Sequence, residues 1–167
     1  SVYQVDADSS AADIVAKRGG KLARFGHDHV VSARKIYGYL ALAGANPVGS
    51  RAELRLDLRS LVVDDPLTRK KYNLNTNPSQ ADIQGTSKNM QDKVLESDKW
   101  PLIHLSLLIT GGTLDALEAN LTVTLHGHQA TLPIVMHVEE LLPGRLIATG
   151  SFKLRQNAFG IKPFSAL

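Results

Sequence analysis

The 167-residue chain carries 19 Lys and Arg against 16 Asp and Glu, which gives a formal net charge of +3. The basic residues are scattered without a Lys/Arg run, so the composition argues against a nucleic-acid-binding arm. The chain has no cysteine, which excludes disulfide and thiolate chemistry, and no apolar run reaches the roughly 20 residues of a membrane-spanning helix. The length fits one domain, residues 1–167, with a sizeable core.

The first third of the chain favours β-strands. Apolar and polar residues predict strands at residues 2–7 and 13–17, followed by a long strand over residues 29–43. Further along, Leu54, Leu56 and Leu58 alternate with charged residues. Alternation of period two is typical of a strand with one buried face.

Residues 64–101 interrupt the alternation with a mostly polar segment. Within it, Ile83 and Met90 share a helical spacing, and Ser79 with Asp82 resembles a capping box at the start of a helix. We therefore expect a short helical insertion between two strands, lying across one mouth of the barrel that the strands predict.

Alternation resumes after this insertion. It predicts a strand over residues 102–110 and further strands that place apolar side chains on one face, among them Leu121, Val123, Ile134, Met136, Phe152 and Leu154. The turns between the later strands are short and contain glycine, which favours antiparallel neighbours. About eight strands joined in this way predict an all-β fold, an eight-stranded antiparallel up-and-down (lipocalin-like) barrel.

The predicted inner face is apolar and contains several small residues, a composition that leaves volume for a hydrocarbon ligand. A packed core without a cavity explains the same alternation, and this alternative stays open. The expected ligand-binding residues are those of the apolar strand faces, with two phenylalanines closing one end: Leu54, Leu56, Leu58, Leu121, Val123, Ile134, Met136, Phe152, Leu154, Phe25 and Phe159.

Two histidine pairs have the spacing His-x-His, and residues two apart on a strand point to the same side. We interpret His126 and His128 as exposed residues of a turn. His27 and His29 stand at the start of a strand, where they either fix a loop by hydrogen bonds or bind a metal ion or haem. No nucleophile elbow, phosphate-binding loop or zinc-protease signature is present, so no catalytic residue is expected.

Six short segments follow one another in a characteristic order along nearly the whole chain. They are YQVD (3–6), FGHDH (25–29), SLVVDD (60–65), WPLI (100–103), LTVTLHG (121–127) and FGIKPF (159–164). In their order and spacing they resemble the YceI-like family of polyisoprenoid-binding, lipocalin-like proteins.

The resemblance implies an exported bacterial protein, periplasmic or secreted, whose barrel binds an apolar or amphiphilic lipid as a carrier or reservoir. It implies no enzymatic activity and no required cofactor, the bound molecule being an isoprenoid or fatty-acid-like lipid. The family continues past residues 159–164 into one more strand, so we expect an open barrel edge here that pairs in a homodimer. The alternative function is that of a metal- or haem-linked redox partner using the Gly-His-Asp-His loop, with His27 and His29 as ligands.

Overall fold

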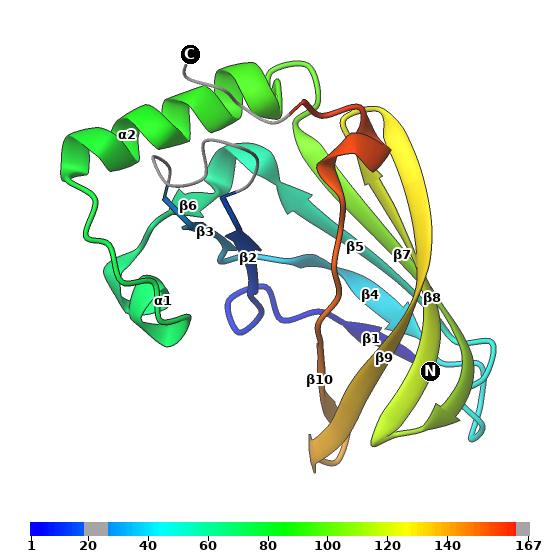
Figure 1. Cartoon of the computed structure of the whole chain (residues 1–167). Coiled ribbons are helices and arrows are strands. Elements are labelled where there is room, and N and C mark those ends of the chain that lie inside the picture. Colours follow the sequence, from blue (N-terminus) through cyan, green and yellow to red (C-terminus); the bar gives the residue numbers. More distant parts are fainter. Residues whose placement is uncertain (19–26, 163–167) are drawn as a thin grey trace. The chain divides into compact units, whose positions relative to one another are not determined.

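The computed structural model describes residues 1–18 and 27–162 (Figure 1). These residues form ten strands, two α-helices and short 3-10 and π-helical turns. They divide into two compact units, which are described separately. The first unit comprises residues 1–5, 37–55 and 103–162, and the second comprises residues 6–18, 27–36 and 56–102.

The first unit is built on a seven-stranded antiparallel sheet that curls into a half-barrel (Figure 1). Its strands, in spatial order, are β1 (Val2–Gln4), β4 (Tyr37–Ala41), β5 (Arg51–Asp57), β7 (Leu102–Thr113), β8 (Ala116–Leu125), β9 (His128–Leu142) and β10 (Arg145–Gly150). β7 to β10 are neighbours in both sequence and space, as their short glycine-containing turns predict. The predicted all-β, barrel-like fold is confirmed, with ten strands in place of about eight.

The register of β7, β8 and β9 aligns apolar side chains in rows across the sheet. Leu107 lies opposite Leu121, which lies opposite Leu132 on its other side. Leu107 and Leu121 are buried, and the polar residues between such rows lie on the other face. Period-two alternation in each sequence thus becomes one continuous apolar face once the register is set.

Gly38 allows β4 and β5 to approach each other closely. It pairs with Leu54, and its φ angle of 151° lies outside the range that L-residues prefer. A Cβ atom built at this position would lie 2.0 Å from the carbonyl oxygen of Glu53. Only glycine fits this position without moving the backbone.

The second unit contains a three-stranded sheet of β2 (Ala12–Ala16), β3 (His29–Ala33) and β6 (Val62–Val63), in the order β2-β3-β6. Its helices are α1 (Pro66–Lys71), α2 (Gln80–Asn89) and a π-helical turn, η3 (Met90–Val94), that continues α2. No helix in the described ranges combines the length and apolar character of a membrane span. The predicted helical insertion is therefore present as α1, α2 and η3.

Side-chain caps fix where the two helices begin. Asp65 precedes α1 and its carboxylate accepts a hydrogen bond from the Thr68 amide, while Pro66 occupies the first turn, where an amide hydrogen has no helical partner. Ser79 and Asp82 form the predicted capping box at the start of α2.

The strand predicted over residues 29–43 is interrupted. Residues 34–36 are not in a strand, and the segments on either side, β3 and β4, belong to different sheets. Continuous strand-forming residues indicate extended backbone, but they do not specify which partner strand supplies the hydrogen bonds.

Two predicted strands end earlier than expected. Leu58 lies in a 3-10 helix, η2 (Leu58–Ser60), because the Asp57 side chain accepts the Arg59 amide and turns the chain. β10 ends at Gly150, opposite Met136, so Phe152 and Leu154 follow the strand.

Candidate functional site

The apolar face of the seven-stranded sheet is the first candidate site. Leu121, Val123 and Ile134 lie on it and are buried, and Met136 lies on it half-buried. Leu54 belongs to the same face, because its neighbour Glu53 points to the polar side, where its carboxylate accepts the Ser106 hydroxyl at 2.7 Å. The structure therefore brings these five predicted residues onto one surface of the first unit.

Toward β10 this face is less covered. Met136 lies opposite Gly150, and Val138 lies opposite Ala148. Met136, Val138 and Leu146 are half-buried, whereas Ala148 and Gly150 are exposed. We call these five residues the open strip, an apolar and partly exposed stretch along β9 and β10 that ends at the exposed Glu140, which lies opposite Leu146.

The remaining predicted ligand-binding residues are distributed differently. Phe152 and Leu154 are each 43% exposed in the segment after β10. Phe159, in the 3-10 helix η4 (Gln156–Phe159), is 1% exposed and belongs to the core. Leu56 and Leu58 are buried in the second unit. Phe25 lies outside the described residues.

The turn between β8 and β9 packs against η4. His126 is half-buried and its Nδ1 lies 3.2 Å from the carbonyl oxygen of Phe159. The rings of His126 and His128 stack with centroids 6.2 Å apart, and a Cβ atom at Gly160 would lie 2.7 Å from the His128 ring. Of this pair, predicted to be exposed turn residues, only His128 is exposed.

A buried charged cluster in the second unit is the second candidate site. The Asp64 side chain is fully buried between β6 and α1, and its Oδ1 accepts hydrogen bonds from Arg69 Nη1 at 2.6 Å and from the Val30 amide at 3.1 Å. Its Oδ2 lies 2.6 Å from His29 Nδ1. Burial raises the pKa of the Asp64 carboxyl, but the hydrogen bonds from His29, Val30 and Arg69 outweigh it and hold the pKa below the ordinary value.

Arg69 uses all its donors within the protein. Its Nη1 also donates to the carbonyl oxygen of Asp28 at 3.0 Å, and its Nε and Nη2 donate to Thr76 at distances between 2.7 and 3.1 Å. A guanidinium has five N–H groups, and these contacts satisfy them all. Arg69 therefore holds β3, β6 and the segment after α1 together and has no donor left for a ligand.

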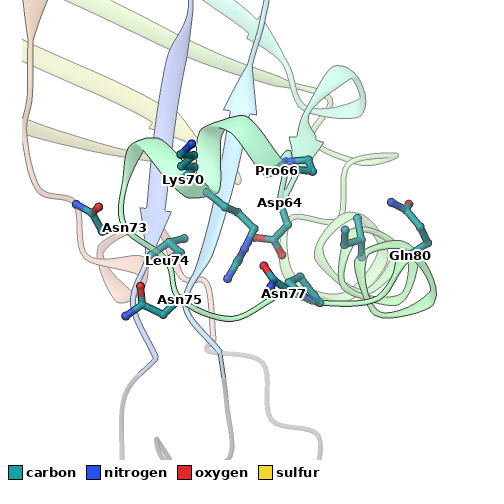
Figure 2. Close-up of a pocket in the computed structure, with 11 residues that line it drawn as sticks. Asp64, Pro66, Lys70, Asn73, Leu74, Asn75, Asn77 and Gln80 are labelled. Carbon is teal, nitrogen blue, oxygen red and sulfur yellow. The ribbon is translucent and has the colours of Figure 1, made fainter.

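A pocket of about 510 Å³ lies beside this cluster (Figure 2). Its lining mixes polar residues, Asp64, Arg69, Lys70, Asn73, Asn75, Asn77 and Gln80, with the apolar residues Pro66, Leu74, Pro78 and Ile83. The sequence interpretation missed the pocket, because its residues follow no periodic pattern.

The structure separates the roles of the predicted histidine pair. The His29 side chain is 28% exposed and points its Nδ1 at Asp64. His27 is exposed and interacts electrostatically with Asp82 at the start of α2. Among the described residues, no three His, Asp or Glu side chains gather closely enough to form a metal cage by themselves.

No protein-family model matches the sequence, and no curated protein matches it. Solved structures do match. BcnA of Burkholderia cenocepacia superposes with a TM-score of 0.63 at 11% identity, over 90% of this chain and 80% of that chain.

Two further solved structures also match over most of the chain. A polyisoprenoid-binding domain from Saccharophagus degradans, implicated in plant cell wall breakdown, matches with a TM-score of 0.63 at 14% identity, over 95% of this chain and 80% of that chain. A mutant CJ YceI protein made for nanotechnology applications matches with a TM-score of 0.58 at 10% identity, over 78% of this chain and 70% of that chain. At these identities the likeness concerns the fold, and the chain has a YceI-like fold.

Proposed function

We propose that this protein binds an apolar or amphiphilic, polyisoprenoid-like lipid against the apolar face of its seven-stranded sheet, and acts as a carrier or reservoir. The observation that carries the proposal is the open strip, where apolar side chains of β9 and β10 remain accessible. The likeness of the fold to a polyisoprenoid-binding domain supports the same ligand class.

The physical basis is burial of hydrocarbon. Each methylene that leaves water contributes about 0.8 kcal/mol, so an extended lipid chain binds without a charged anchor. Ala148 and Gly150 are small and exposed, so they add little bulk to the surface on which we place such a chain. The open strip follows the direction of β9 and β10, so its long axis suits an extended lipid chain.

The sequence resemblance extends the proposal to an exported bacterial protein that carries its ligand without a chemical reaction and without a further cofactor. A homodimer formed through an open sheet edge belongs to the same proposal. Sedimentation of the purified protein tests that part separately.

Native mass spectrometry of protein purified from its own host tests the lipid proposal. We expect an added mass that organic extraction releases as a polyprenyl or related lipid, and stoichiometric uptake of added polyprenol by stripped protein. A bare protein mass together with no uptake of polyprenol or fatty acid would contradict the proposal.

A further inference from the structure

We propose that His27 and His29 form a binding site for a divalent transition-metal ion such as Zn²⁺ or Ni²⁺. This site lies in the second unit and its function is independent of lipid binding. Imidazole nitrogen is a preferred ligand of these ions, and two histidines with solvent molecules in the other positions give a weak, exchangeable site.

The orientation of His29 is the first argument. Asp64 is held as a carboxylate by Arg69 and Val30, so its Oδ2 accepts a hydrogen bond from Nδ1–H of His29 across 2.6 Å. The neutral imidazole is thereby fixed in the tautomer whose Nε2 carries the lone pair. Within the part of the chain that the structure describes, this Nε2 has no hydrogen-bond partner. A carboxylate behind a histidine is the usual support of a metal-binding imidazole.

The anchored backbone between the two histidines is the second argument. The Asp28 carbonyl oxygen accepts Arg69 Nη1 at 3.0 Å, and the Asp28 carboxylate accepts the Arg18 amide at 2.8 Å. His27 precedes the start of β3 by two residues, and in extended backbone such a residue points to the same side as His29. These contacts hold the backbone between the two histidines, which lowers the cost of ordering both imidazoles around one ion.

The charges around the site are compatible with a bound cation. Arg69 is paired with Asp64, and Lys17 and Arg18 are paired with Asp28. On the α2 side, the pKa of the Asp82 carboxyl is lowered mainly by hydrogen bonds from Ser79, with a smaller electrostatic contribution from His27. The surrounding cations are thus compensated by nearby carboxylates.

Titration of the full chain with Zn²⁺ and with Ni²⁺ by calorimetry at neutral pH tests the site. We expect one saturable site that His27→Gln and His29→Gln each weaken at least 10-fold. His29→Gln keeps an amide donor for Asp64, so folding is preserved. The matched control is His104→Gln, an exposed histidine on β7, which leaves binding unchanged.

Asp64→Asn probes the support of His29 and is expected to weaken binding about 10- to 100-fold in the folded protein. Where that variant does not fold, paramagnetic broadening of the His27 and His29 ring signals by Ni²⁺ in the unmodified chain shows whether both rings lie at the ion. Saturable binding that survives His27→Gln and His29→Gln but is lost in His126→Gln/His128→Gln would overturn the assignment. So would the absence of any saturable binding by the unmodified chain.

Discussion

Asp64 and Arg69, five residues apart, form a buried ion pair in which Oδ1 and Nη1 are 2.6 Å apart. The Asp64 side chain is 0% exposed and that of Arg69 is 6% exposed. The pair joins the end of β6 to α1, and through Val30 and the Asp28 carbonyl it also holds β3. It is therefore the polar centre around which the second unit is organised.

Asp64→Asn should strongly destabilise the protein. Asparagine keeps the size of the side chain but removes the charge, which leaves the Arg69 guanidinium buried without its counter-ion. Breaking a buried pair in this way costs about 3–5 kcal/mol in the free energy of unfolding. Urea denaturation measures this cost, and Asp92→Asn is the control, because the exposed Lys88–Asp92 pair contributes at most about 1 kcal/mol. Equal midpoints for the two variants would contradict the assigned role of Asp64.

The same carboxylate makes stability depend on pH. The pKa of Asp64 is lowered from 3.8 in the folded protein, so the ionised form is favoured by folding. The resulting stabilisation is complete above the pKa of the unfolded chain and is lost as the pH falls through the lower pKa of the folded protein. The difference in unfolding free energy between the unmodified chain and Asp64→Asn should thus shrink as the pH falls below about pH 4. A difference in unfolding free energy that grows on acidification would contradict the lowered pKa of Asp64.

Gly38→Ala should disrupt the pairing of β4 with β5. The added Cβ would meet the Glu53 carbonyl oxygen at 2.0 Å, and the backbone must shift to relieve the clash. A loss of about 1–3 kcal/mol or more in unfolding free energy is expected. Gly44→Ala is the matched control, because a Cβ there has no atom within 4 Å. Thermal unfolding of both variants compares them directly.

Leu121→Ala should lower the free energy of unfolding, because Leu121 lies in the core of the first unit. Leu121 is 1% exposed and lies between Leu107 and Leu132 in the sheet register, so truncation leaves a cavity. Such substitutions cost about 2–5 kcal/mol. Leu114→Ala, at a residue that is 54% exposed, should change stability by less than about 0.5 kcal/mol. Calorimetric unfolding distinguishes the two, and a small effect at Leu121 would mean that the apolar face is loosely packed.

Sequence reasoning located the strands with strong alternation and the helix with a cap. The alternation that includes Leu121 and Val123 corresponds to β8, and Ser79 with Asp82 marks the start of α2, because both signals are local. The division of residues 29–43 between two sheets was missed, since the partner of a strand is a long-range property.

The candidate sites were predicted only in part for the same reason. Alternation placed Leu121 and Ile134 on one face, but it could not show that coverage decreases toward Ala148. The histidine spacing drew attention to His29, whereas its contact with Asp64 spans 35 residues of sequence and needs the fold. Asp64 and Asp65 are adjacent carboxylates after a strand. No local feature of the sequence shows that Asp64 is buried whereas Asp65 caps α1.

The most direct measurement of the central claim is polyprenol uptake by a pair of variants on β10. Ala148 lies on the apolar face opposite Val138, and Thr149 lies on the other face opposite His137, and both are exposed. A carboxylate on the binding surface loses hydration when a lipid covers it, so Ala148→Glu should reduce uptake at least about 10-fold. Thr149→Glu should bind like the unmodified chain. Equal uptake by both folded variants would contradict lipid binding at the apolar face.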